Sequence, residues 1–438
     1  MAMVPNKQQQ EVLSILLKWA KSDEKYIVLN GPGGVGKTFL LRLFAEQCLC
    51  PVMFLAPTHE ALSQLKKAIG DGDFIYKTVH SALALTPDIT KSSISFNHIK
   101  TPAIWRDVQI AVIDEASMIP QWILDILIDT GTKILFVGHK SQLPPVEEKR
   151  KTTDLCVSPV FNMKVPQLEL TIPMRNSGDI WEYTVLAEKK IYDKTIVLPD
   201  QFIISASDFK EYMYSEKGKQ DLLKGRIKLV AWRNVTVNEY NKRVRDVLFN
   251  KPEEKYSVGD IVILTSPTFL VKDLESLKPL HLEKLFKEKD DLKSLFTNTK
   301  GRVQNISECS IMLDIKLTVK CYKLLIQTGG YVQTIYEFKN PDDYTRVSTF
   351  FEHRAWGFKD QKDKKRAYSY RYFILSLFAR LLHFYAATAH RLQGSTVEKV
   401  IVLDNDLKKN PCYVEQAKCR YVACSRAAKE LKIYRGFA

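Results

Sequence analysis

The stretch that most constrains this chain is Gly31 to Thr38, which reads Gly-Pro-Gly-Gly-Val-Gly-Lys-Thr. It follows the apolar run Tyr26 to Leu29 and precedes the apolar segment Phe39 to Phe44, so the pattern predicts a strand, a loop and a helix. The spacing Gly-x4-Gly-Lys-Thr is typical of a phosphate-binding loop, whose backbone N–H groups converge at the start of the following helix. A chance glycine-rich turn is the alternative, and the flanking strand and helix argue against it.

The residues of this loop have separate expected roles. Lys37 would contact the β- and γ-phosphates of a nucleoside triphosphate, and Thr38 would hold a magnesium ion. We therefore expect a nucleoside triphosphate and Mg²⁺ as the ligands. The other residues expected to contact the nucleotide here are Gly33, Gly34, Val35, Gly36 and Phe39.

Composition narrows the class of protein. The 438 residues are 45% hydrophobic, enough for two to four domains with cores of their own. A net charge of +15 favours a polyanionic partner, either nucleic acid or a membrane surface. No apolar run reaches membrane-spanning length, no signal-peptide pattern opens the chain, and the eight cysteines match no zinc spacing. We expect a protein of the cytoplasm, the host cytoplasm if the source is viral, with reduced cysteines.

A second chemical signature follows the apolar run Asp107 to Ile113. Asp114 and Glu115 stand at the end of this predicted strand, downstream of the phosphate loop. Asp114 would hold the hydrated magnesium, and Glu115 would take a proton from the attacking water. Gln142 follows the next predicted strand, Lys133 to Val137, and is placed to sense the γ-phosphate.

Short polar clusters at other predicted strand ends are candidates for contact with a phosphate backbone or a base, because parallel sheets bind ligands there. Pro57, Thr58 and His59 follow the buried run Pro51 to Leu55, and Thr78-Val79-His80-Ser81 is a similar cluster. Thr58 is explained equally well as a helix N-cap.

Three further residues each leave two interpretations open. Gln8 lies in the first turns of a predicted amphipathic helix over 4–20, where it could bond an adenine edge or be solvated. Arg175 could stabilise charge in phosphoryl transfer or be an ordinary surface arginine. Residues 81–101 are polar and turn-rich, which predicts a small inserted hairpin in which Phe96 could stack on a base.

A second α/β domain is expected from about residue 171. The predicted helix from Asn234 to Val247 carries Lys242, Arg243 and Arg245, which could contact phosphates or form a solvated face. Its predicted strands are Ile227 to Trp232, Ile261 to Leu264, His383 to Ala386, Val400 to Leu403 and Leu431 to Tyr434.

Residues 270–380 do not continue this alternation of predicted strands and helices. The predicted strands Ser310 to Leu313, Leu317 to Tyr322 and Tyr331 to Tyr336 suggest a small β-barrel with an added hook. The segment His353 to Tyr372 interleaves basic and aromatic residues, which suits single-stranded nucleic acid but is equally consistent with a charged helix.

These clusters together resemble the ordered motif set of superfamily 1 helicases, and within it group B, the RecD-like enzymes. The shared motifs are Gly31 to Thr38, Ala56 to His59, Asp114-Glu115, Gly138 to Val146, Thr171 to Arg175, His390 to Thr396 and Tyr421 to Ala427. Thr78 to Ser81 and the short insertion also match. The chain departs from the family at His139, where an acidic residue is usual, and at Ser425, where threonine is usual.

The resemblance implies an α/β fold with two RecA-like P-loop parallel-sheet domains, a small β-hairpin pin and an SH3-like β-barrel insertion. The first RecA-like domain would span 1–80 and 102–170, and the pin 81–101. The second would span 171–269 and 381–438, with 270–380 as the SH3-like tower and hook.

The resemblance also assigns roles. It makes Gln8 an adenine contact, Gln142 part of the nucleotide site, and Arg175 and Arg426 arginine fingers. It makes Phe96 the pin aromatic. The DNA contacts it implies are Pro57, Thr58, His59, Thr78, His80, Lys242, Thr388 and His390.

The resulting expectation is an ATP-dependent DNA helicase that moves 5′-to-3′ on single-stranded DNA and unwinds duplex junctions during replication or recombination. We expect a monomer with no membrane partner, and a single-stranded-DNA-binding or replication protein is a candidate partner. A DNA-independent P-loop ATPase that remodels protein complexes is the alternative.

Overall fold

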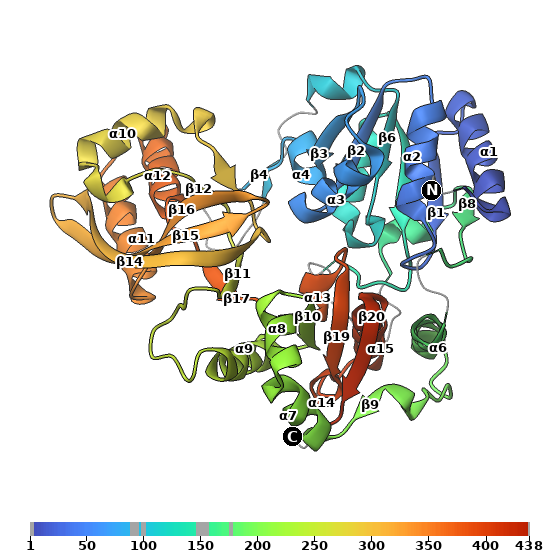
Figure 1. The fold of residues 1–438 in the computed structure, drawn as a ribbon. Coiled ribbons are helices and arrows are strands. Elements are labelled where there is room, and N and C mark those ends of the chain that lie inside the picture. Colours follow the sequence, from blue (N-terminus) through green and yellow to red (C-terminus); the bar gives the residue numbers. More distant parts are fainter. Residues whose placement is uncertain (1–3, 88–95, 98–101, 146–156, 175–177, 437–438) are drawn as a thin grey trace. The chain divides into compact units, whose positions relative to one another are not determined.

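A computed structural model describes residues 4–87, 96–97, 102–145, 157–174 and 178–436, and divides the chain into two units (Figure 1). The first unit comprises Met1–Thr86, His98–Tyr240 and Ala386–Ala438, and the second comprises Pro87–Asn97 and Asn241–Tyr385. Arg175 lies outside the described residues, so its expected role stays a prediction.

The first sheet of unit 1 is parallel throughout, with the strand order β3-β2-β6-β7-β1-β8. Its inner strands are short apolar runs buried on both faces, as parallel sheets covered by helices require. The strands are β1 (Tyr26–Asn30), β2 (Val52–Ala56), β3 (Ile75–Thr78), β6 (Ile110–Ile113), β7 (Lys133–Gly138) and β8 (Gln167–Glu169). The helices are α1 (Lys7–Lys21), α2 (Lys37–Gln47), α3 (His59–Ile69), α4 (Val79–Ala82) and α5 (Gln121–Asp129).

The second sheet of unit 1 is also parallel throughout, with the order β18-β10-β19-β20-β9. Its strands are β9 (Ile203–Ile204), β10 (Ile227–Ala231), β18 (Ala386–Thr388), β19 (Val397–Leu403) and β20 (Ala427–Tyr434). The accompanying helices are α6 (Asp179–Tyr192), α7 (Ala206–Tyr214), α8 (Glu216–Leu223), α13 (Ala389–Leu392), α14 (Asp404–Leu407) and α15 (Tyr413–Ser425). The predicted α/β fold with two parallel sheets is confirmed.

Unit 2 is built on an antiparallel sheet with the order β16-β15-β14-β11-β17. Its strands are β11 (Ile261–Leu264), β14 (Lys300–Asp314), β15 (Leu317–Thr328), β16 (Tyr331–Phe338) and β17 (Leu381–His383). Its helices are α10 (Pro279–Lys287), α11 (Asp342–Trp356) and α12 (Gln361–Ser376), and β12 (Thr268–Phe269) pairs with β13 (Ser294–Leu295). Helix α9 (Asn234–Leu248) spans the boundary between the units.

Two strand predictions at this boundary were wrong. Ile261–Leu264 was expected in the second parallel sheet, but it pairs antiparallel with β14 and β17. The expected strand His383 to Ala386 is two strands: β17 ends at His383 in the antiparallel sheet, and β18 begins at Ala386 in the parallel sheet. An apolar run of four or five residues carries no information on its partner strand, which explains both errors.

The expected hairpin over 81–101 is described in part. β4 (Thr86–Pro87) and β5 (Phe96–Asn97) form a two-stranded sheet. Residues 88–95 and 98–101, together with the side chain of Phe96, lie outside the described residues, so the pin and its aromatic stay predictions.

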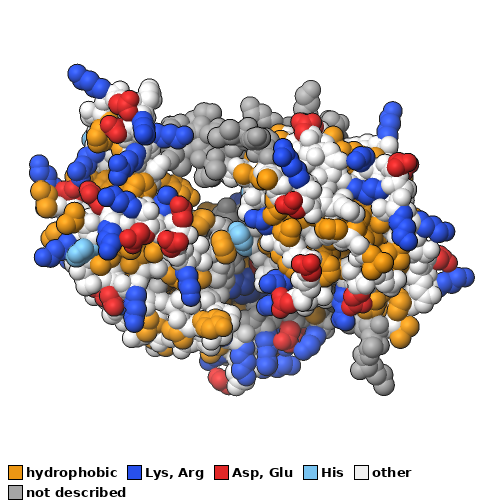
Figure 2. Space-filling model, turned by 90° about the horizontal axis from the view of Figure 1, so that it is seen from above, with side chains coloured by type: hydrophobic (Ala, Val, Ile, Leu, Met, Phe, Trp, Pro, Cys, Tyr) orange, Lys and Arg blue, Asp and Glu red, His pale blue; other side chains and the backbone are white. Residues whose placement is uncertain are grey.

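The surface carries the excess positive charge without a single dominant patch on the face shown in Figure 2. Lys and Arg side chains are spread over that face, with fewer Asp and Glu between them. None of the described helices is both long and apolar enough to cross a membrane.

Candidate functional site

The phosphate loop lies at the carboxyl end of β1 and opens into α2. Gly36 is the N-cap of α2 and has a left-handed φ of +81°, which favours glycine. A Cβ built there would lie 2.5 Å from Nε2 of Gln9. Gln9 is fully buried, and its Nε2 donates a hydrogen bond of 3.2 Å to the carbonyl of Val35. Helix α1 therefore supports the loop through Gln9, a residue that the sequence analysis did not select.

Lys37 is bonded to the loop it follows. Its Nζ donates to the carbonyl oxygens of Gly31, at 2.6 Å, and Pro32, at 2.8 Å. The ammonium group is thus held inside the curve of the loop, where an incoming phosphate would compete for the same donors. This placement fits the expected contact of Lys37 with the β- and γ-phosphates.

Asp114 and Glu115 follow β6 at the same edge of the sheet. Burial raises the pKa of Asp114 to about 6, the charge of Glu115 adds to this, and Lys37 opposes it. Glu115 has a left-handed φ of +52°. A Cβ on Gly394, itself at φ +79°, would lie 3.6 Å from Oε1 of Glu115, so the chain at Gly394 closely approaches this carboxylate.

Asp114→Asn should stabilise the fold at neutral and alkaline pH. The raised pKa means that the folded state favours the protonated carboxyl, so ionised Asp114 lowers stability as pH rises from about 4 through about 6. Without divalent cations, urea unfolding should show Asp114→Asn about 1–3 kcal/mol more stable than the wild type at pH 8, and no more stable below pH 4. Exposed Asp107, just before β6, provides the control Asp107→Asn. A loss of stability at pH 8 would contradict this account.

Gln142 is buried and joined to the second sheet's motifs by a relay of hydrogen bonds. Ser117 Oγ donates to Oε1 of Gln142 at 2.7 Å, and Nε2 of Gln393 donates to Ser117 Oγ at 3.0 Å. Gln393 also donates to the carbonyl of Leu143 at 3.5 Å. The residue expected to sense the γ-phosphate is therefore connected, through Ser117, to the segment that follows His390.

Arg426 reaches the phosphate loop from the end of α15. The side chain is buried, and its Nη2 would lie 3.6 Å from a Cβ on Gly33. It is oriented by hydrogen bonds to Ser425 Oγ, at 2.9 Å from Nη2, and to the carbonyl of Ser395, at 3.3 Å from Nη1. An arginine in this position can neutralise charge on a phosphate held by the loop.

A cavity of about 50 Å³ lies between the loop and this arginine. That is room for about one or two water molecules, so a triphosphate can enter only if the surrounding side chains move apart. The residues that line it are Gly33, Gly34, Ile180, Trp181, Thr184, Thr396, Cys424, Ser425, Arg426 and Ala427.

His139, which replaces the family's usual acid, is the centre of a buried polar network. Its Nε2 lies 3.1 Å from Oε1 of Glu188 on α6, and its Nδ1 lies 3.0 Å from the hydroxyl of Tyr421 on α15. Burial lowers the pKa of His139. Ser141 Oγ also donates to Glu188, at 2.8 Å. Glu188 thus supplies a carboxylate beside the position where the family has one in the motif itself.

The expected adenine contact, Gln8, is bonded to the chain after β8. Its Oε1 accepts the backbone N–H groups of Thr171, at 3.0 Å, and Ile172, at 3.2 Å. Its Nε2 donates to Thr171 Oγ1 at 3.2 Å and to the carbonyl of Glu169 at 3.3 Å. The amide is thus fully engaged, and it would exchange some of these bonds to contact a base.

Three of the expected DNA contacts are helix N-caps at the carboxyl ends of parallel strands. Oγ1 of Thr58 accepts the N–H of Ala61, that of Thr78 accepts the N–H of Ser81, and that of Thr388 accepts the N–H of Arg391. The capping alternative for Thr58 is therefore correct. It does not exclude phosphate contact, because uncapped N–H groups at helix starts also attract anions.

The histidines that follow these caps have distinct surroundings. Burial lowers the pKa of His59, and the ring of His80 lies 6.4 Å from that of Trp122. Pro57 is half-buried.

The basic residues of α9 separate into two groups. Lys242 and Arg243 are exposed, as a phosphate contact requires. Arg245 is buried, and its Nε lies 3.1 Å from Oδ2 of Asp260, so neither interpretation left open for it, a phosphate contact or a solvated face, is correct. A buried ion pair of this kind is structural, since breaking it would leave Asp260 uncompensated.

Sequence reasoning also missed Lys418, which lies in the middle of α15. Only 1% of it is exposed, and its Nζ donates to the carbonyl oxygens of Lys140 and Gln142, both at 3.1 Å. The sequence contains no sign of this role, because Lys418 stands between Glu415 and Arg420 in a segment of ordinary charge.

A phosphate loop, two carboxylates on the neighbouring strand and an arginine from a second parallel sheet define a P-loop nucleoside triphosphatase. A family model described as "AAA domain" matches residues 5–187. The chain is 25% identical to the ATP-dependent DNA helicase Dda of Enterobacteria phage T4 over 439 aligned residues, covering 94% of this chain and 97% of Dda.

Solved structures of Pif1 helicases share the fold. The Pif1 helicase of Candida albicans superposes with a TM-score of 0.52 at 18% identity, covering 100% of this chain and 95% of that one. A Pif1 structure concerned with unwinding of forked double-stranded DNA by two coordinating copies gives 0.53 at 15% identity, covering 98% and 92%. The likeness to Dda along nearly the whole chain confirms the resemblance predicted from the motifs, and the Pif1 structures show the same fold.

Proposed function

We propose that this chain is an ATP-dependent DNA helicase that moves 5′-to-3′ along single-stranded DNA and unwinds duplex DNA ahead of it. The observation that carries the proposal is the approach of Arg426, beside the second parallel sheet, to Gly33 in the phosphate loop of the first. A nucleotide bound there would touch both sheets, so hydrolysis can change how they meet. The likeness to the ATP-dependent DNA helicase Dda along 94% of the chain supports DNA as the substrate.

The residues at the site fit ATP and magnesium. Thr38 and Asp114 would hold Mg²⁺, which neutralises charge on the β- and γ-phosphates when bound. The raised pKa of Asp114 fits a carboxylate built to face a cation, since a nearby positive charge would lower that pKa again. Lys37 would leave the carbonyl oxygens of Gly31 and Pro32 for the phosphates.

The remaining groups act on the reacting atoms. Glu115 would accept the proton of the attacking water, and Gln142 would orient that water or bond the γ-phosphate. Arg426 would neutralise the charge that develops as the bond breaks, and Arg175 would act as a second arginine finger. When the phosphate leaves, Arg426 loses its anionic partner, and the two sheets are free to separate.

Movement along DNA would use the strand-end clusters. Thr58, His59, Thr78 and His80 lie at or just after the carboxyl ends of strands in the first sheet. Thr388 and His390 lie at the corresponding end of a strand in the second. If the residues of the two sheets bind the DNA strand tightly in alternation, and this alternation follows the hydrolysis cycle, the protein moves in one direction. Lys242 would add a phosphate contact. Phe96 in the inserted pin would separate base pairs, and melting one base-pair step costs about 1.4 kcal/mol.

The same proposal covers architecture and surroundings. The two parallel sheets would be the cores of two RecA-like domains, residues 81–101 the pin, and the antiparallel sheet of unit 2 an SH3-like insertion. We propose a monomer that acts on single strands and forks in the cytoplasm.

Gln393→Ala should uncouple hydrolysis from DNA. The substitution removes the donor that links Ser117 and Gln142 to the segment after His390. We expect the ratio of kcat with DNA to kcat without DNA to fall by about fivefold or more. Gln361→Ala, at the exposed first residue of α12 in unit 2, is the matched control. If Gln393→Ala and Ser117→Ala lowered this ratio additively, the relay would not act as a unit.

Stimulation of ATP hydrolysis by single-stranded DNA tests the proposed function. A steady-state assay with an unstructured oligonucleotide should show a large increase in kcat. Active protein with the same kcat with and without DNA would contradict the proposal, and would favour a DNA-independent ATPase that remodels protein complexes.

A further inference from the structure

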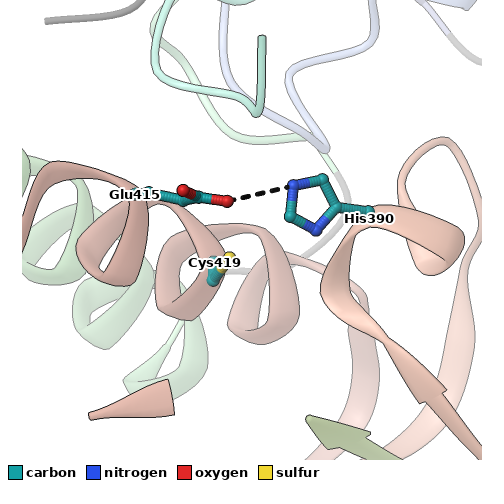
Figure 3. Close-up of side chains that lie close together, drawn as sticks. All are labelled: His390, Glu415 and Cys419. Atoms are coloured by element: carbon teal, nitrogen blue, oxygen red, sulfur yellow. Dashed lines mark ion pairs between the residues drawn. The ribbon is translucent and has the colours of Figure 1, made fainter. Parts of the chain in front are cut away.

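Three side chains with metal-binding donors converge on α13 and α15 (Figure 3). They are His390 on α13 and Glu415 and Cys419 on α15. One donor atom from each lies within 4.8 Å of the others, and Nε2 of His390 lies 3.5 Å from Oε1 of Glu415. Nothing in the nucleotide site uses Glu415 or Cys419.

The fold explains why these donors meet. Glu415 and Cys419 are four residues apart on one helix, so they project from the same face on successive turns. Thr388 caps α13 and starts the short helix that presents His390 toward that face. The side chains of His390 and Glu415 are 26% and 16% exposed, and Cys419 is buried beneath them. The cluster is therefore reachable from solvent on its imidazole and carboxylate side.

The donor types select a class of cation. An imidazole nitrogen, a carboxylate oxygen and a thiolate sulfur suit zinc, whereas magnesium and calcium take oxygen ligands. Three protein ligands leave the fourth tetrahedral position to water. Zinc bonds of about 2.0–2.3 Å place tetrahedral ligand atoms about 3.3–3.8 Å apart, so the separations here need only small side-chain rotations.

We propose that His390, Glu415 and Cys419 form a binding site for a borderline-soft divalent cation, zinc above all. Binding requires the thiolate of Cys419 and releases its proton to solvent. The cation joins α13 to α15 and holds His390 against Glu415. This site is independent of the nucleotide site and of its magnesium.

The site has a consequence that rests on the proposed function. His390 is one of the residues proposed to contact DNA, so a cation bound to its ring competes with nucleic acid for that side chain. Zinc at this site should weaken binding of single-stranded DNA in the absence of nucleotide.

Cobalt(II) titration tests the site, because thiolate-to-cobalt charge transfer gives an ultraviolet band that reports sulfur ligation. Full-length protein should bind one more equivalent of Co²⁺ than Cys419→Ser, with a charge-transfer band that zinc removes. Cys412→Ser, at the start of α15 and outside the cluster, should keep this equivalent. Any Co²⁺ bound at Cys48 and Cys50, whose sulfurs lie 3.0 Å apart, is common to all three proteins.

Glu415→Gln provides a second variant in which the buried thiol is intact. It should lower Co²⁺ affinity by about 10-fold or more while keeping the wild-type melting temperature. Equal cobalt stoichiometry and affinity in the wild type, Cys419→Ser and Glu415→Gln would overturn the site. This result would leave the proposed helicase function untouched, because the titration uses neither ATP nor DNA.

Fluorescence anisotropy with a labelled oligonucleotide then tests the consequence. Zinc should raise the Kd of the wild type for single-stranded DNA severalfold and leave that of Cys419→Ser unchanged. The same zinc effect in both proteins would overturn the competition at His390.

Discussion

Lys37→Ala is expected to abolish ATP hydrolysis. The ammonium group of Lys37 lies inside the curve of the phosphate loop, where it donates to the carbonyl oxygens of Gly31 and Pro32. Within the loop, Gly31 to Thr38, Lys37 is the one lysine. Without it the developing charge on the phosphates loses a direct partner, which costs about 10²-fold or more in kcat. A steady-state phosphate-release assay measures the effect.

The control for this prediction is Lys18→Ala, which removes an exposed lysine from α1 without touching the loop. It should hydrolyse ATP at the wild-type rate. Near-normal turnover by a folded Lys37→Ala protein would show that the loop is not the catalytic phosphate site.

Glu115→Gln should bind ATP and fail to turn it over. The amide keeps the shape of the side chain beside Gly394 but cannot accept a proton, so kcat should fall by about 10²–10⁴-fold. Nucleotide affinity should change little, because Lys37 and the loop remain. Equilibrium binding of a fluorescent ATP analogue and single-turnover hydrolysis separate the two effects.

Glu11→Gln, on the exposed side of α1, is the matched control and should behave as the wild type. Full activity in Glu115→Gln would remove this residue as the base. Loss of nucleotide binding would instead assign Glu115 a role in holding the ligand.

Much of the architecture was predictable because the signals are local. Each inner strand of the first sheet is an apolar run that ends in a polar cluster, and a parallel α/β sheet places such clusters at one edge. The phosphate loop, the Asp114-Glu115 pair and the position of Gln142 follow from this rule. The strands within β14, β15 and β16 were also predicted, although the structure extends them.

The rest depends on contacts between distant segments. Ile261 to Leu264 would suit either kind of sheet, and only its pairing with β14 and β17 decides between them. From the sequence, Arg245 is expected to be a surface charge, and only the structure shows that it forms an ion pair with Asp260. Gln9 and Lys418 donate hydrogen bonds to backbone carbonyl oxygens that are distant in the sequence. The residues around them in the sequence therefore do not indicate these partners.

The role of Glu188 shows the same limit. The sequence motif has a histidine, His139, where the helicases it resembles usually have an acid, and the carboxylate of Glu188, on the separate helix α6, lies 3.1 Å from that histidine. Motif reading compares positions along the chain, whereas the chemistry depends on which groups meet in space.

Unwinding of tailed duplexes tests the central claim most directly. A short duplex with a 5′ single-stranded tail and one with a 3′ tail are mixed separately with protein, ATP and Mg²⁺, and strand separation is followed by fluorescence. We predict ATP-dependent separation of the 5′-tailed duplex alone, and none with Lys37→Ala. Separation of the 3′-tailed duplex instead would contradict the direction of movement, and no separation of either duplex by protein that hydrolyses ATP would contradict helicase function.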